Sequence, residues 1–255
     1  MRSLNKILTA ACFLATANFV LAQTAEEILK KHIEAVGGLE KLAAIKTLKI
    51  SGKSSRGGGR FEAKFVRYIK LPNMVRNEME MRGQTMVQAY DGEKAWGIMP
   101  FRGSSEPQEF PGGRGESVLR MADLTGPLVH AREKGFEVEL AGQEEFEGTE
   151  VFKLKVTDKD GGVFHSFIDD EYFLEIKRSV ERTSPDGEKV EVTTLFSDFK
   201  PVSGIMVAHS VTTQGGGFGG RGGRRGPGGG GANTMTLESI EVNVEIDDAI
   251  FKMPK

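Results

Sequence analysis

From residue 47 to the end of the chain, apolar and polar residues alternate in short segments separated by Gly, Pro, Asn and Asp. A period of two is typical of strands with one buried face, and those four residue types favour turns. Strands are expected over residues 48–54, 60–69, 75–81, 85–90, 95–99, 137–141, 151–157, 163–168, 173–182, 189–199, 206–213 and 234–244. Because no helix-sized crossovers connect consecutive strands, the pattern predicts an antiparallel meander, curled or nearly closed.

Helical periodicity is found in three places. Thr24 and Glu27 match a capping box, which begins an amphipathic helix in which apolar residues recur at helical spacing. A second, short helix is expected over residues 39–45. A third is expected over residues 117–122, inside the one long break between strands, residues 104–135. We interpret this break as an excursion that covers the sheet.

Residues 1–22 have the pattern of a secretory signal peptide, in which basic residues precede an apolar run and small residues allow cleavage after Ala22. The run is too short and too polar for a spanning helix, so we expect export to the periplasm. Cys12, the only cysteine, lies in this segment. The mature chain, residues 23–255, is expected to be one domain without disulfides, thiolate metal sites or a cysteine nucleophile.

Glycine and arginine are concentrated in residues 215–231, which include Arg221, Arg224 and Arg225. Such a composition also occurs in RNA-binding segments. Three features argue against an RNA-binding protein: the expected export, the net charge of −2, and the presence of only one aromatic residue, Phe218, within this segment. No nucleic-acid partner is expected. The simpler interpretation is a flexible loop between two strands, and an alternative is that its arginines contact anionic lipid or polysaccharide.

One face of the expected sheet is aromatic and rich in methionine. Methionine adapts to irregular shapes, so a concave surface of this kind could hold flexible acyl chains. The residues predicted to line such a cavity are Phe65, Met79, Met81, Met86 and Trp96. The competing interpretation is that the same residues form a packed core beneath the helices.

Arg67 falls on the same parity as the apolar residues of its strand. A buried guanidinium is costly unless it meets an acid or lies at the rim of a cavity. Two roles are therefore open for Arg67: an ion pair with a neighbouring carboxylate, or contact with the polar headgroup of a ligand.

The sequence patterns of common catalytic sites are absent: there is no nucleophile elbow, Walker loop, zincin motif or dinucleotide fingerprint. The four histidines fall in separate segments. Acidic residues at 169–171 and 247–248 lie where strands end, and there they serve as turn formers or caps. We therefore expect no catalytic residue, no metal and no cofactor, and we do not expect an enzyme.

Two segments resemble the outer-membrane lipoprotein-sorting family, the LolA-like periplasmic carriers: Lys70-Leu71-Pro72-Asn73, and Asp91-Gly92-Glu93-Lys94-Ala95-Trp96-Gly97-Ile98-Met99-Pro100-Phe101. The runs at 197–205 and 246–254 resemble long bacterial relatives of the same family. The resemblance implies a mainly β fold with a few helices: a half-open antiparallel β-barrel covered by a helical lid over an apolar cavity.

The resemblance also implies a function, which is to carry the acyl chains of lipoproteins or other lipids, with an inner-membrane release transporter and an outer-membrane receptor as partners. The family motif has arginine immediately before the proline, where this chain has Leu71. That position is associated with transfer of the lipoprotein, so an apolar-ligand carrier, expected as a monomer, fits better than a complete shuttle. The alternative is a non-catalytic envelope interaction or structural protein with a packed core, in which residues 215–231 bind a partner.

Overall fold

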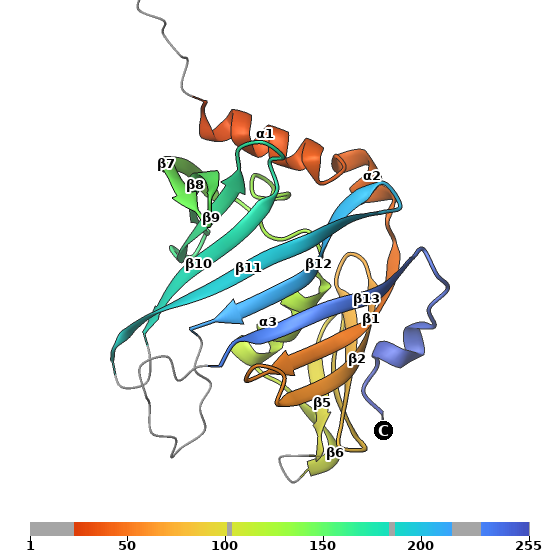
Figure 1. Cartoon of the computed structure of the whole chain (residues 1–255). Helices are drawn as coiled ribbons and strands as arrows, with labels where there is room; N and C mark the ends of the chain where they lie inside the picture. Colours follow the sequence, from red (N-terminus) through yellow and green to blue (C-terminus); the bar gives the residue numbers. More distant parts are fainter. Residues whose placement is uncertain (1–22, 101–103, 184–186, 216–230, 255) are drawn as a thin grey trace, which may run out of the picture.

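A single antiparallel sheet of 13 strands dominates the computed structural model (Figure 1), which describes residues 23–100, 104–183, 187–215 and 231–254. The strand order is β6-β5-β4-β3-β2-β1-β13-β12-β11-β10-β9-β8-β7, so the sheet is open, with β6 and β7 at its edges. The mainly β, antiparallel architecture expected from the alternation is confirmed. The predicted signal peptide and most of the Gly/Arg-rich segment lie outside the described residues.

The chain enters the sheet in the middle and runs to one edge in six consecutive strands. These are β1 (Thr47–Arg56), β2 (Phe61–Lys70), β3 (Met74–Met81), β4 (Gln84–Asp91), β5 (Ala95–Met99) and β6 (Ser104–Glu109). Strand β6 was not expected, because it falls inside the predicted break and contains Pro107. Proline cannot donate to a strand ladder, and its position in an edge strand removes this conflict.

After β6 the chain crosses to the opposite edge and returns to the middle, where β13 pairs with β1. The returning strands are β7 (Glu137–Phe146), β8 (Thr149–Thr157), β9 (Val163–Asp169), β10 (Glu175–Thr183), β11 (Lys189–Val202), β12 (Ile205–Gln214) and β13 (Asn233–Val242). Strand β7 is longer than expected because the register shifts between Leu140 and Gly142, and pairing continues beyond this bulge.

Three helices and two single turns of 3₁₀ helix accompany the sheet in the described part of the chain: α1 (Ala25–Ala35), α2 (Leu39–Ala44), α3 (Gly113–Leu119), η2 (Arg120–Ala122) and η3 (Asp248–Phe251). The capping box at the start of α1 is confirmed, since Thr24 and Glu27 exchange both hydrogen bonds. In the described ranges, no helix combines the length and the apolar character needed to cross a membrane.

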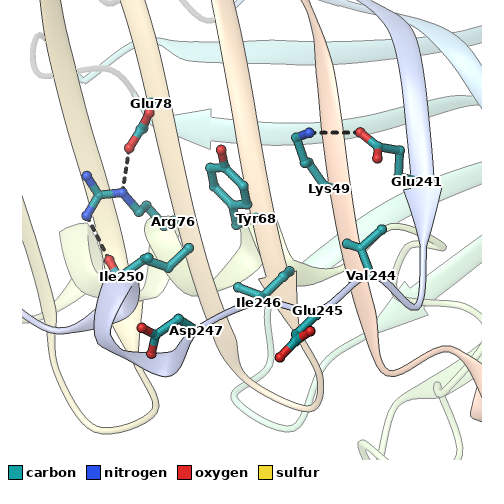
Figure 2. Close-up of a pocket in the computed structure, with 10 residues that line it drawn as sticks. All are labelled: Lys49, Tyr68, Arg76, Glu78, Glu241, Val244, Glu245, Ile246, Asp247 and Ile250. Atoms are coloured by element: carbon teal, nitrogen blue, oxygen red, sulfur yellow. Dashed lines mark hydrogen bonds and ion pairs between the residues drawn. The ribbon is translucent and has the colours of Figure 1, made fainter.

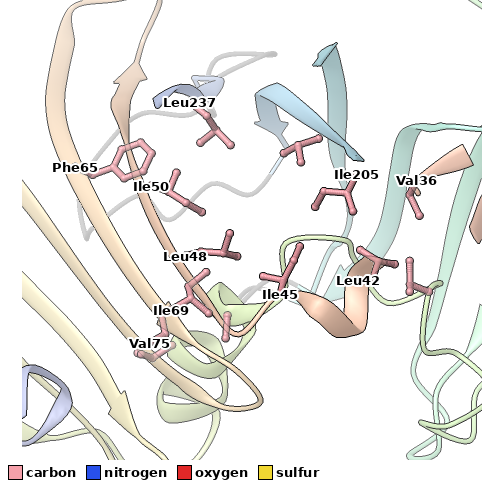
Figure 3. Packing of buried hydrophobic residues seen from close by; sticks show 14 of the residues in the cluster. Val36, Leu42, Ile45, Leu48, Ile50, Phe65, Ile69, Val75, Ile205 and Leu237 are labelled. Atoms are coloured by element: carbon pink, nitrogen blue, oxygen red, sulfur yellow. The ribbon is translucent and has the colours of Figure 1, made fainter. Parts of the chain in front are cut away.

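Two hydrophobic clusters cover one face of the sheet, which we call the inner face. In the larger cluster, Leu42 of α2, Val118 of α3 and Ala122 of η2 pack with residues of the central strands, such as Leu48 and Ile69 (Figure 3). The smaller cluster packs Ile28 of α1 against β8 and β9. The crossover between β6 and β7 therefore supplies much of the covering layer, as the sequence predicted.

The opposite, outer face carries the C-terminal segment. Phe251 of η3 is fully buried there, and η3 contacts β3 and β4. Val87 and Ala89 of β4 form a third small cluster with Trp96 on this side. The sheet therefore has an apolar patch on both faces at this end.

Candidate functional site

The strand register decides which of the predicted site residues share a face. Phe65 pairs directly with Met79, and Met79 pairs directly with Met86. Directly opposed residues project from the same face, and Met81 lies two residues from Met79 on β3. The structure therefore brings Phe65, Met79, Met81 and Met86 together on the inner face.

Trp96 does not belong to this group, and its expected place beside the methionines is corrected. It pairs with Ala89, whose side chain alternates with that of Met86 along β4 and so projects from the other face. Its indole packs with Val87 and Ala89 on the outer face and is fully buried there.

The four inner-face residues differ in exposure. Phe65 is 2% exposed and belongs to the larger hydrophobic cluster, so at this position the core interpretation holds. Met79, Met81 and Met86 are partly exposed and belong to none of the buried clusters. We call these three residues the methionine surface.

The apolar inner face continues beyond the methionine surface into the second half of the chain, which the sequence analysis did not include. Met235 of β13 pairs with Val211 of β12, which in turn pairs with Phe196 of β11. All three are partly exposed. Their alternation within the strands was visible in the sequence, but the pairing of β13 with β1 that joins both halves was not.

Arg67 projects from the inner face between Phe65 and Ile69 along β2. Its Nε donates a hydrogen bond of 3.2 Å to Oδ1 of Asn77, and its guanidinium lies 5.6 Å from the ring centroid of Phe65. Burial lowers the pKa of Arg67 to about 10, so it stays charged at neutral pH. Among the described residues it forms no ion pair, so the ion-pair role considered for Arg67 is not fulfilled there.

A second polar group lies on the same face in β9 and β10. Glu175 is buried and accepts hydrogen bonds from Arg178 and from the hydroxyl of Ser166. The Arg178 guanidinium also lies 5.2 Å from the ring centroid of Phe196. Unlike Arg67, Arg178 has its charge balanced within the chain.

Outside the inner face, a pocket of about 510 Å³ lies between the outer face of the sheet and the C-terminal segment (Figure 2). Tyr68 and Val244 contribute apolar surface. Its floor carries two ion pairs, Lys49 with Glu241 at 2.9 Å and Arg76 with Glu78 at 2.7 Å. The charges on this floor are therefore largely neutralised by one another.

Leu71, which stands where the carrier motif has arginine, is 36% exposed in the turn between β2 and β3. Its backbone N–H donates to the carbonyl oxygen of Lys46 at 2.8 Å, beside the end of α2. Two of the acidic turn and cap positions have the roles expected of them, since Asp169 accepts from the backbone N–H of Tyr172 and Asp247 from that of Ala249.

Within the described ranges, no three His, Cys, Asp or Glu side chains are grouped so that they could hold a metal ion. The buried Ser166 contacts a carboxylate and not a histidine. His32 is buried too, and its Nδ1 lies 2.8 Å from the carbonyl oxygen of Phe173.

Known structures share this architecture. A LolA superfamily protein from Nitrosomonas europaea has a TM-score of 0.58 at 15% identity, covering 91% of this chain and 98% of that chain. A DUF1329 family protein from Desulfovibrio piger has a TM-score of 0.59 at 12% identity, covering 91% and 98%. A domain named for outer-membrane lipoprotein sorting, from Vibrio parahaemolyticus, has a TM-score of 0.53 at 12% identity, covering 89% and 97%.

Comparison with family models and with curated proteins found no match. The likeness therefore concerns the three-dimensional fold and extends over nearly the whole length of each related structure. The mainly β, antiparallel fold with a few helices that the carrier-like motifs implied is confirmed, and the sheet is open, not closed. This chain therefore shares its fold with a LolA superfamily protein and with an outer-membrane lipoprotein-sorting domain.

Proposed function

We propose that this protein is a periplasmic carrier that binds the acyl chains of a lipoprotein or another lipid on the inner face of its sheet. The observation that carries the proposal is that both halves of the inner face present partly exposed apolar side chains: the methionine surface on β3 and β4, and Val211 and Phe196 on β12 and β11. Soluble proteins seldom leave such a surface open unless it meets a ligand or a partner. The names of two similar structures, which refer to LolA and to lipoprotein sorting, support this choice.

The binding free energy would come from burial of the acyl chain. Each methylene removed from water contributes roughly 0.8 kcal/mol before the cost of ordering the chain is subtracted. Thioether side chains suit this purpose because they adjust to acyl chains of different length and shape. Phe65 would form the floor beneath the chain, with Met79, Met81 and Met86 around it.

Mass spectrometry of organic extracts tests the proposal on mature protein purified from a bacterial periplasm without detergent. Acylated ligand near one per protein is the expected result. Folded protein that carries no lipid and binds no added fatty acid would contradict the proposal.

Substitution of the methionine surface localises the site. Met79→Glu or Met81→Glu places a carboxylate among the acyl contacts and should abolish lipid occupancy while the protein stays folded. Thr236→Glu is the matched control, because Thr236 is exposed on the outer face, where it pairs with Lys53. This control should retain its lipid.

The remaining parts of the proposal follow from the carrier role. Residues 1–22 would be removed as a signal peptide after Ala22, and the mature monomer would carry ligand without catalysing a reaction and without a cofactor. An inner-membrane transporter and an outer-membrane receptor are the partners that a sorting role would require. Leu71 in place of arginine favours simple carriage of an apolar ligand over a complete transfer cycle.

A second candidate is a non-catalytic interaction protein of the envelope. The observation that favours it is the 510 Å³ pocket on the outer face, which is separate from the methionine surface. Deletion of residues 215–231 tests whether the Gly/Arg-rich segment binds a partner. Loss of a co-purifying partner with unchanged lipid occupancy would assign the interaction to that segment.

A further inference from the structure

Arg67 is a cation on the inner face without a carboxylate partner among the described residues. Ile50 and Asn77 lie directly opposite it on the two neighbouring strands. Only its Nε is engaged, by Oδ1 of Asn77, and both terminal nitrogens lack an acceptor within the described part of the chain. The guanidinium lies beside the Phe65 ring.

Amide side chains extend this polar position into a short row. Asn77 pairs directly with Gln88 on β4, and both project from the same face as Arg67. Gln88 in turn pairs with Gly97 on β5. A Cβ atom at Gly97 would lie 2.5 Å from the Phe110 ring, so this ring covers the end of the row.

The row lies next to the methionine surface. Met79 and Met81 are two and four residues along β3 from Asn77, or about 7 Å and 13 Å at the usual rise of a strand. A headgroup held at Arg67 would therefore have its first carbons over Met79 and later carbons over Met81.

The guanidinium of Arg67 determines which kind of headgroup can bind beside it. A half-buried charge without a partner is unfavourable, and the paired terminal nitrogens of arginine match the two oxygens of a carboxylate or phosphate. The acyl groups of a lipoprotein are held as amides and esters, which carry no charge and would leave Arg67 unmatched. Burial lowers the pKa of Arg67, and no acid among the described residues offsets this effect.

We propose that Arg67, Asn77 and Gln88 form a headgroup site for an oxyanion, so that the ligand is an anionic amphiphile whose chain lies on the methionine surface. This inference rests on the proposed carrier function and narrows it. The oxyanion is the carboxylate of a fatty acid or the phosphate of a phospholipid.

Displacement of a neutral fluorescent probe, N-phenyl-1-naphthylamine, from the mature protein at pH 8 tests the headgroup site. Laurate should displace the probe at about 10-fold to 100-fold lower concentration than methyl laurate, which is the range expected for a hydrogen-bonded charge. In Arg67→Met this preference should vanish while displacement by methyl laurate is unchanged. Dodecyl phosphate is the parallel ligand, and the tighter of the two anions identifies the oxyanion.

Lys64→Met is the matched control, because Lys64 is an exposed cation on the outer face of the same strand. It should keep the full preference for laurate. If Arg67→Met does not fold, Arg67→Lys retains the charge without the planar fork and should weaken laurate alone.

Equal displacement by laurate and methyl laurate in the wild-type protein would overturn the headgroup site while leaving the carrier function intact. A preference that persists in folded Arg67→Met would overturn it as well. Failure of every amphiphile to bind folded protein would overturn both proposals.

Discussion

The indole Nε1 of Trp96 donates a hydrogen bond of 2.7 Å to the main-chain carbonyl oxygen of Phe251. Both side chains are fully buried on the outer face of the sheet. A second bond of 2.7 Å joins Nη1 of Arg76 to the carbonyl oxygen of Ile250. Two neighbouring carbonyl groups thus attach the C-terminal segment to β3 and β5.

Phe251→Ala should detach this segment and destabilise the protein by about 3–5 kcal/mol, the usual cost of removing a buried phenylalanine. Trp96 is the only tryptophan, so its fluorescence reports the change directly. The emission should shift to the red as water reaches the indole, and urea unfolding should give the stability loss. Met253→Ala, at a side chain that is 39% exposed, should change neither measurement. Unchanged emission in Phe251→Ala would contradict this account.

His32 should make stability depend on pH. Burial lowers its pKa from the usual 6.5, and Nε2 is buried without a partner among the described residues. The unfolded chain therefore binds a proton at higher pH than the folded chain does. The contribution of neutral His32 to the free energy of unfolding is complete above pH 6.5. As the pH drops below 6.5, this contribution decreases by at most about 1.4 kcal/mol per pH unit.

Urea unfolding at pH 7.5 and 5.5 measures the effect of His32. His32→Gln keeps a donor for the carbonyl of Phe173 and should show a smaller stability loss between these two pH values. His130→Gln, at a histidine whose side chain is 40% exposed, should behave as the wild-type protein does. Equal pH dependence in wild type and His32→Gln would refute the assignment.

Glu175→Gln should destabilise the protein by about 3 kcal/mol or more, because it leaves Arg178 as a partly buried charge without its counterion. The side chains of Glu175 and Arg178 are 7% and 24% exposed. Glu181→Gln removes the partner of Lys189 in a pair whose side chains are more than half exposed, so it should destabilise the protein much less than Glu175→Gln does. Chemical denaturation compares the two variants, and similar losses would mean that burial does not strengthen the Glu175 contact.

Gly52→Ala tests the close packing beneath Phe65. A Cβ atom at this position would lie 2.1 Å from the carbonyl oxygen of Thr236 and 3.0 Å from the Phe65 ring. Backbone must move to admit it, so we expect a loss of about 1–3 kcal/mol in thermal or urea unfolding. Gly113→Ala, at the open start of α3, meets no atom within 4 Å and should be neutral or slightly stabilising. A stable Gly52→Ala protein would show that β1 and β13 tolerate separation.

Local chemistry explains why much of the fold was predictable. The capping box of Thr24 and Glu27 acts within four residues, so a short stretch of sequence is enough to predict the start of α1. Alternation likewise identified which residues of one strand share a face. The prediction that Phe65 and Met79 lie together needed only this alternation and a short hairpin.

The misplacement of Trp96 shows where such reasoning ends. Alternation within β4 and within β5 was correct, but the face assigned to one strand relative to the next depends on which residues pair across the turn. A change of one residue in this pairing moves a side chain to the other face. The contact between Trp96 and Phe251 joins residues 155 positions apart, and no local sequence pattern predicts it.

On the side away from β2, β1 pairs with β13, which is the last strand in the sequence. This pairing joins the two meanders at the middle of the sheet. Until β13 has been synthesised, β1 must leave one side of its ladder unsatisfied. The strand that completes the hydrogen bonding is among the last to arrive. Such a long sequence separation slows folding. The unfinished protein therefore presents an unpaired central strand to its surroundings, and for that interval protection from wrong partners has to come from outside the chain.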